Sequence, residues 1–218
     1  MYIPKALVVQ LQERFHIPYF IETGTYFGNT ASWASRFFDH VYTIELSNKL
    51  AAAAQRRFAG TNVTCVKADS RAALRQILAK TADQPRLFWL DAHWSSGITA
   101  GESDQCPLLD ELALILERAD KQPEQYIFID DARYFMAPVP ELNPAHWPSI
   151  YDVLHALRRG NSSFQAVHRD VIISVPKSAE RIVVEHVRST PRTFAERVEM
   201  LPWSLRGRLM TWSLNRKS

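Results

Sequence analysis

The chain has 218 residues, of which 46% are hydrophobic and 22% are charged, as is typical of a globular protein with a sizeable core. The formal net charge of +3 is too small to indicate binding to nucleic acid. No window approaches the roughly eighteen uncharged apolar residues of a membrane-spanning helix, and the first residues lack the basic-then-apolar pattern of a signal peptide. We therefore expect a soluble, cytoplasmic protein that does not bind nucleic acid.

Basic residues gather toward the end of the chain. Residues 177–218 contain nine Lys or Arg and four Glu, so the composition predicts a domain over residues 1–176 and a basic C-terminal extension over residues 177–218. An apolar stripe at helical spacing in this extension consists of Leu201, Leu205, Leu209 and Trp212. The stripe fits packing on the domain, a homo-oligomer contact or peripheral contact with an anionic membrane, and these alternatives stay open.

Short apolar runs of strand length alternate with stretches of helical periodicity. After a leading helix over residues 6–15, strands are predicted at 19–22, 41–45, 63–67, 87–90 and 126–129. Helices follow the first four strands, from the end of the loop 23–28 to about 37, and over 48–58, 72–80 and 107–118. A last helix at 149–158 precedes a hairpin of 165–168 and 171–175. The pattern predicts an α/β fold with a doubly wound, mostly parallel sheet and a closing antiparallel hairpin.

Carboxylates stand at the carboxyl ends of the predicted strands, where a doubly wound sheet places its ligand crevice. Each of the five parallel strands ends at or beside one of Glu22, Glu45, Asp69, Asp91, Asp130 and Asp131. Helix capping accounts for Asp69 and one more, because Asp before a helix commonly caps it, but it does not account for all six. The sequence therefore predicts a polar ligand site at this edge of the sheet.

The loop after the first strand carries two glycines, Gly24 and Gly28, which permit a tight turn and a close approach of a ligand to the backbone. The Gly-x-Gly-x-x-Gly spacing of a dinucleotide site and the Gly-Lys-Ser/Thr of a P-loop are both missing. Glu45 follows Gly24 by about twenty residues, the position where a carboxylate accepts two ribose hydroxyls in nucleotide-binding folds of this type. A nucleoside-containing ligand is therefore expected.

Three segments, 20–30, 41–47 and 66–70, resemble in order the first three motifs of the class I S-adenosylmethionine methyltransferases, and the likeness runs over about residues 19–131. It implies a Rossmann-like methyltransferase fold with S-adenosyl-L-methionine as cofactor. By this resemblance Glu22, Gly24 and Gly28 shape the methionine end, Glu45 holds the ribose and Asp69 lies near the adenine. The cofactor-binding set implied is completed by Thr25, Thr30 and Ser70.

Two further segments, 90–94 and 129–131, resemble the metal-binding segments of catechol-type and macrocin-type O-methyltransferases. The resemblance implies a Mg²⁺ ion held by Asp91, Asp130 and Asp131, whose hard oxygen ligands suit this ion. The alternative is that Asp91 orients the substrate and the other two form a solvated turn. Catechol-type enzymes carry a catalytic lysine shortly after the first metal-binding Asp, and this chain has no lysine there. His93, together with Asp91, is therefore the expected catalytic group.

The expected activity is methyl transfer to a hydroxyl oxygen of a small molecule, sugar or glycan. Two other functions remain open. One is a dinucleotide-dependent oxidoreductase or sugar-nucleotide enzyme, against which the missing third glycine argues. The other is a non-catalytic scaffold domain that retains a nucleoside pocket.

Overall fold

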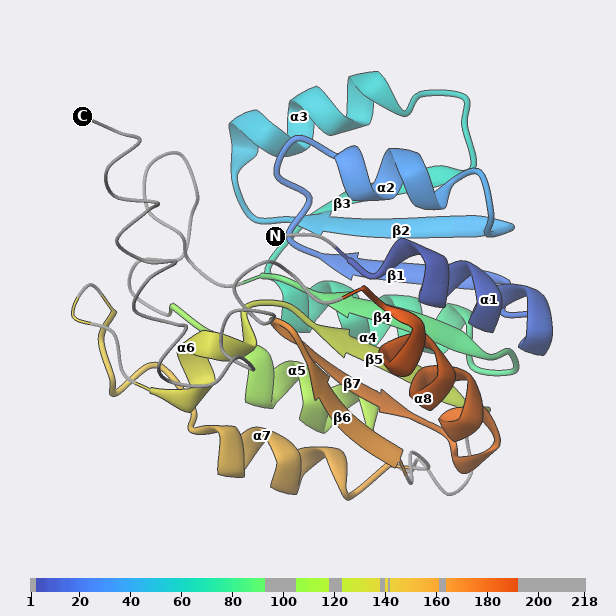
Figure 1. The fold of residues 1–218 in the computed structure, drawn as a ribbon. Coiled ribbons are helices and arrows are strands. Elements are labelled where there is room, and N and C mark those ends of the chain that lie inside the picture. Colours follow the sequence, from blue (N-terminus) through green and yellow to red (C-terminus); the bar gives the residue numbers. More distant parts are fainter. Residues whose placement is uncertain are drawn as a thin grey trace, which may run out of the picture. The chain divides into compact units, whose positions relative to one another are not determined.

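A seven-stranded sheet with the strand order β3-β2-β1-β4-β5-β7-β6 organises the computed structural model (Figure 1). Strands β1 to β5 run parallel, and β7 runs antiparallel to both β5 and β6. The structure describes residues 3–92, 105–117, 123–137, 140, 142–160 and 164–191. The doubly wound sheet with its closing antiparallel hairpin, predicted from the sequence, is confirmed.

The strands are β1 (Tyr19–Thr23), β2 (His40–Glu45), β3 (Val63–Lys67), β4 (Arg86–Leu90), β5 (Gln125–Ile129), β6 (Phe164–His168) and β7 (Val171–Val175). The helices are α1 (Lys5–Phe15), α2 (Asn29–Ala34), α3 (Asn48–Arg57), α4 (Ser70–Lys80), α5 (Leu108–Ile115), α6 (Ala132–Met136), α7 (Ile150–Leu157) and α8 (Glu180–Ser189), with a short 3-10 helix over Lys177–Ala179. Every residue of β4, β5 and β7 is buried, which explains why these strands read as continuous apolar runs.

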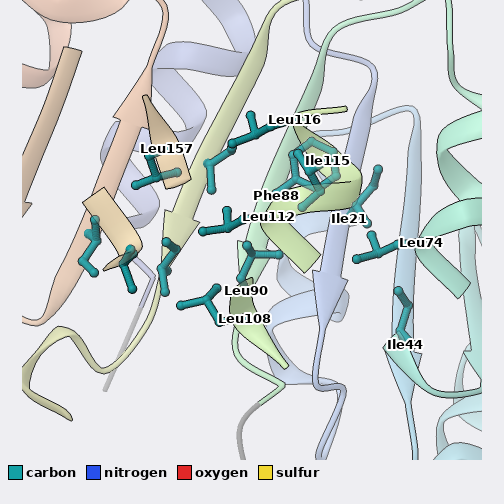
Figure 2. Packing of buried hydrophobic residues seen from close by; sticks show 14 of the residues in the cluster. Ile21, Ile44, Leu74, Phe88, Leu90, Leu108, Leu112, Ile115, Leu116 and Leu157 are labelled. Carbon is teal, nitrogen blue, oxygen red and sulfur yellow. The ribbon is translucent and has the colours of Figure 1, made fainter. Parts of the chain in front are cut away.

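Helices cover both faces of the sheet (Figure 1). Helices α1, α2 and α3 lie on one face, and α4, α5 and α7 lie on the other. Figure 2 shows the second face, where side chains of α5 and α7 pack against alternate residues of the strands. Leu112 of α5, for instance, is fully buried in the same cluster as Ile21 and Phe88. This packing fixes the strand ends that carry the polar residues, because one helix contacts several strands at once.

Two helices were not predicted from the sequence, and two others, α2 and α5, are shorter than expected. Helix α6 has only five residues, and α8 begins four residues after the predicted domain boundary. Helix α2 ends at Ala34, three residues before the expected end, and continues as turns. Helices α2 and α6 are short and begin without a side-chain N-cap, so the periodicity and capping signals that mark a helix are weak there.

The chain divides into two compact units, residues 1–183 and 184–218. The division falls within α8, whose residue Val183 is fully buried in the first unit. The apolar stripe predicted over residues 201–212 lies outside the described residues. Across the described ranges, the structure contains no helix with the length and apolar character that a membrane crossing requires.

The strand register brings the carboxyl ends of four strands to one edge. Thr23 at the end of β1 pairs with Ile44 of β2 on one side and with Leu90 of β4 on the other, and Leu90 pairs with Ile129 of β5. The strand order reverses between β1 and β4, so this edge contains the topological switch point at which α/β sheets bind ligands.

Candidate functional site

The loop that joins β1 to α2 is held in place by its two glycines. Gly24 has φ +87° and donates its N–H to the Ile44 carbonyl at 3.0 Å. A Cβ atom on Gly24 would lie 2.3 Å from the Asp91 carbonyl oxygen, and one on Gly28 would lie 2.9 Å from the Phe58 ring. At Gly24 contact with the protein's own backbone is therefore enough to require glycine, and at Gly28 a φ of +71° together with the Phe58 ring favours it. The loop therefore lies between the end of β4, at Asp91, and the end of α3, at Phe58.

A buried carboxyl and three threonines form a hydrogen-bonded group beneath this loop. Thr43 donates its hydroxyl to the Glu22 carboxyl at 2.6 Å, and the hydroxyls of Thr25 and Thr43 lie 2.7 Å apart. Thr30 of α2 also hydrogen-bonds to Glu22. Burial of Glu22, which is 2% exposed, raises its pKa to about 8 despite these donors. The structure thus brings three of the predicted cofactor residues together and keeps the carboxyl protonated near neutral pH.

Thr43 is a member of this group that the sequence reasoning missed. It pairs in register with Glu22 on the neighbouring strand, so the two side chains share one face of the sheet. The period-2 alternation of strand β2 places Thr43 on the same face as Glu45. That alternation could have identified Thr43 from the sequence, but only if the pairing of β1 with β2 had been assumed.

Glu45 is at the end of β2 and is 6% exposed. One of its carboxylate oxygens accepts the Tyr26 N–H at 2.9 Å, and the other accepts the Ser47 N–H at 2.9 Å. Each oxygen has a second lone-pair site, so the carboxylate retains acceptor capacity for two hydroxyl donors. Glu45 therefore links the β1 loop to the start of α3 while remaining able to bind a diol.

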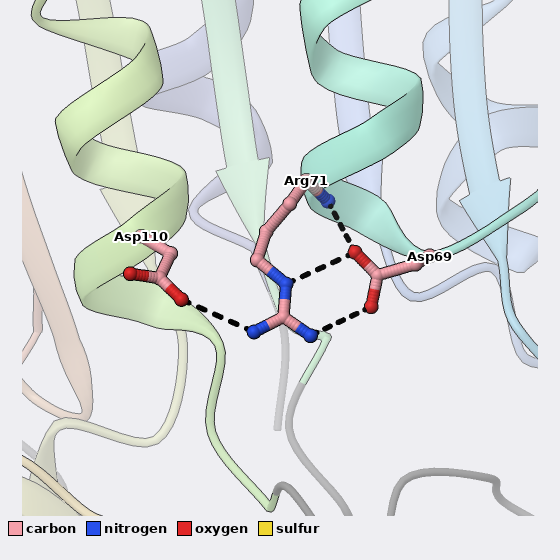
Figure 3. A network of polar contacts seen from close by, with 3 residues as sticks. All are labelled: Asp69, Arg71 and Asp110. Carbon is pink, nitrogen blue, oxygen red and sulfur yellow. Dashed lines mark hydrogen bonds and ion pairs between the residues drawn. The ribbon is translucent and has the colours of Figure 1, made fainter.

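Asp69 is committed to an arginine (Figure 3). It caps α4 by accepting the Arg71 N–H at 3.0 Å, and its two oxygens also accept the Arg71 side chain at 3.0 and 2.8 Å. Arg71 reaches Asp110 of α5 at 3.1 Å on its other side. The Arg71 guanidinium lowers the pKa of Asp69. The helix-cap function considered for Asp69 in the sequence is confirmed, and the same side chain also ties α4 to α5.

Glu111 of α5 is a buried acid that the sequence reasoning passed over. It is 1% exposed, accepts the Thr23 hydroxyl at 3.4 Å, and also hydrogen-bonds to the predicted cofactor residue Ser70. Burial raises its pKa to about 7. Thr23 in turn accepts the Asp91 N–H, through its carbonyl at 3.0 Å and its hydroxyl at 3.3 Å. Glu111 therefore connects the start of α4 with the end of β1, and through Thr23 with the residue that follows β4.

Asp130 and Asp131 follow β5 directly, as predicted, but Asp131 already has a cation as partner. Asp130 is 5% exposed and accepts the Asp131 N–H at 2.8 Å, while Asp131 pairs with Arg133 at 2.6 Å. Arg133 also forms an ion pair with Asp170, from the turn between β6 and β7. The sequence analysis did not consider Arg133 as a partner of these acids. Arg133 contacts Asp170, which is 37 positions away in the chain, and such a contact leaves no local sequence pattern.

The predicted magnesium site is not confirmed. Asp91, Asp130 and Asp131 do lie on neighbouring strand ends, since the Asp130 N–H donates to the Leu90 carbonyl at 3.1 Å. Among the described residues, however, no group of three or more His, Cys, Asp or Glu is arranged to hold a metal ion. The ion pair of Asp131 with Arg133 also fits poorly with a divalent cation on the same carboxylate. His93, the predicted base, and the loop 93–104 lie outside the described residues.

Comparisons with known proteins identify the fold. No protein-family model and no curated protein sequence matches the chain. Among solved structures, an O-methyltransferase from Bacillus cereus in complex with S-adenosylhomocysteine is 17% identical, with 81% of this chain and 83% of that chain covered and a TM-score of 0.55. The O-methyltransferase TomG from Streptomyces achromogenes, in complex with S-adenosylmethionine, is 16% identical, with 81% of each chain covered and a TM-score of 0.54.

A sugar N-methyltransferase from a Streptoalloteichus species is also similar, at 12% identity and a TM-score of 0.50, over 79% of this chain and 85% of that chain. At such low identity the likeness concerns the fold alone. The chain has the fold of these S-adenosylmethionine-dependent methyltransferases.

Proposed function

We propose that the protein is an S-adenosylmethionine-dependent methyltransferase that acts on a hydroxyl oxygen of a small molecule, sugar or glycan. The observation that carries this proposal is the joining of Glu22 and Glu45 to one glycine-bearing loop at the switch point of a methyltransferase-type sheet. A nucleoside with a charged tail needs a diol acceptor at one end and an acidic group at the other, and these two carboxyl groups meet both needs.

The cofactor would lie along the ends of β1 to β3. Glu45 has the acceptor capacity for both ribose hydroxyls, since its backbone donors occupy one lone-pair site on each oxygen. Glu22, with Gly24, Thr25, Gly28 and Thr30 around it, would face the methionine end. A positively charged ammonium favours the ionised form of a nearby carboxyl, so we expect Glu22 to lose its proton when the cofactor binds.

The adenine end would lie near Asp69 and Ser70, at the start of α4. The Asp69 carboxylate is held by Arg71. We therefore expect the adenine to contact the backbone at the start of α4 and not this carboxylate. Ser70 hydrogen-bonds to the buried Glu111.

When bound, the cofactor supplies the methyl group of a sulfonium, which transfers to the acceptor oxygen by in-line displacement with release of S-adenosylhomocysteine. The protein's contribution is to hold the two reactants in line and to take up the hydroxyl proton. Asp91 and His93 are the residues that we propose for orienting the acceptor and accepting its proton. The backbone of Asp91 is fixed by Thr23, which supports a positioning role.

The two alternative functions predict different results. A dinucleotide-dependent enzyme is disfavoured because the loop lacks a third glycine. A scaffold domain would bind the nucleoside without turnover. A third alternative is methyl transfer to an amine nitrogen of the acceptor, because a sugar N-methyltransferase has a similar fold.

The experiment is a transfer assay with S-adenosylmethionine labelled in its methyl group. A panel of phenols, sugars and their amino-sugar counterparts serves as acceptors, and the labelled position is assigned by NMR. We expect label on a hydroxyl oxygen of at least one acceptor, with S-adenosylhomocysteine formed in equal amount. Label only on nitrogen would revise the acceptor class, and tight cofactor binding with no transfer to any acceptor would favour the scaffold.

A further inference from the structure

A positively charged side chain lies among the acidic residues that follow β5. Arg133, in the first turn of α6, pairs through one guanidinium nitrogen with Asp131 at 2.6 Å and with Asp170. The backbone N–H of Arg133 also donates to the Asp170 carboxylate at 2.8 Å, and the Ala132 N–H donates to the Asp170 carbonyl at 3.0 Å. The arginine is thus held by contacts from its backbone as well as its side chain.

The carboxylates around Arg133 are shielded from water and need a cation. The side chains of Asp131 and Asp170 are 13% and 10% exposed, whereas Arg133 is 43% exposed and lies over the Tyr134 ring at 4.3 Å. Removing a carboxylate from water is unfavourable unless an opposite charge lies close to it. Arg133 supplies that charge to two carboxylates at once.

The backbone around the acid pair supports the same arrangement. Asp131 has φ +57° and ψ +43°, a left-handed conformation that costs energy for a residue with a Cβ atom. The Asp131 N–H donates to Asp130, and its side chain reaches Arg133, so both contacts favour this conformation. In these contacts Asp130 accepts a backbone donor and Asp131 accepts a guanidinium.

From these contacts we infer that Arg133 occupies the electrostatic role that a divalent cation has in metal-dependent methyltransferases, and that Asp131 holds this arginine and is not a metal ligand. A Mg²⁺ ion on Asp131 would lie close to the guanidinium, and the two positive charges would repel each other. The inference deepens the proposed function, on which its relevance to catalysis rests. Its test uses metal binding and unfolding, which need no acceptor substrate and can succeed or fail independently of the methyl-transfer assay.

The test compares Mn²⁺ binding by wild-type protein, Asp131→Asn and Arg133→Met in calorimetric titrations. Asparagine tolerates the left-handed conformation of residue 131, so Asp131→Asn is expected to fold. We expect the wild-type protein and Asp131→Asn to give the same Mn²⁺ titration. A stoichiometric Mn²⁺ site in the wild-type protein that is lost in Asp131→Asn would overturn the inference.

Thermal unfolding gives a second readout. Arg133→Met removes a positive charge that lies next to two shielded carboxylates, so we expect the unfolding midpoint to fall by about 3–6 °C and Mg²⁺ to restore part of the loss. Arg36→Met is the matched control, since Arg36 lies over the Phe37 ring at 6.0 Å as Arg133 lies over Tyr134. Equal midpoints for the two variants, or a rise with Mg²⁺ in the wild-type protein that Asp131→Asn abolishes, would contradict the role given to Arg133.

Discussion

The two halves of the sheet satisfy their buried acids in different ways. On the side of β1 and β2, Glu22 is surrounded by neutral threonine hydroxyls and Glu45 by backbone N–H groups. On the side of β5 and β7, Asp131 and Asp170 share a guanidinium. Neutral donors leave the first half able to receive a positively charged ligand, whereas the second half is already compensated. The contrast supports our proposal that the first half binds the cofactor.

The junction between the halves is Gly24, and breaking it has the largest expected effect. Gly24→Ala introduces a Cβ atom 2.3 Å from the Asp91 carbonyl at a φ of +87°, so we expect a loss of about 3 kcal/mol or more in the free energy of unfolding. Gly60→Ala is the control, because Gly60 has φ +75° but no atom within 4 Å of the added Cβ. It should cost only about 1 kcal/mol. Equal losses of unfolding free energy for Gly24→Ala and Gly60→Ala in urea would contradict the importance given to the contact between Gly24 and Asp91.

The end of the first unit gives the next largest effect. A chain that stops after Ser178 loses Val183, which is fully buried, whereas a chain that stops after Pro191 keeps it. Burial of a valine side chain contributes about 2 kcal/mol, so we expect urea unfolding to give the shorter chain a free energy of unfolding lower by that amount and the longer chain the value of the full protein. Identical stability of both truncated chains would support the boundary at residue 176 predicted from the sequence.

A pH dependence of stability sharpens the description of the first half. The pKa of Glu22 is about 8 in the folded protein and 4.5 in the unfolded chain, so the folded state binds more protons between these values. Stability without cofactor should therefore fall as pH rises from 5 to 8, by up to about 1.4 kcal/mol per pH unit for this carboxyl. Glu22→Gln should flatten the slope in urea unfolding, and Glu13→Gln on the exposed face of α1 should not. A slope unchanged by Glu22→Gln would assign the pH dependence to other groups, of which Glu111 is the first to test.

The sequence predicted the strands and their terminal carboxylates because both depend on short-range patterns. Apolar runs mark β4 and β5, and an acid directly after a strand must lie at the sheet edge. The partners of those acids depend instead on contacts distant in sequence. Neither the pairing of Arg133 with Asp170 nor the position of Gly24 against Asp91 has a local signal, since 37 and 67 residues separate the partners. Sequence reasoning therefore located the acids correctly but could not determine which of them were neutralised.

The central claim is that Glu45 holds the ribose of a bound S-adenosyl nucleoside, and calorimetric titration with S-adenosylhomocysteine tests it most directly. We expect one site per chain, with NAD binding far more weakly. Glu45→Ala should weaken S-adenosylhomocysteine binding by about 1.5–3 kcal/mol, the scale of lost hydrogen bonds to a charged group, while Glu13→Ala should leave it unchanged. Unchanged affinity in Glu45→Ala, or NAD binding as tight as that of S-adenosylhomocysteine, would contradict the account.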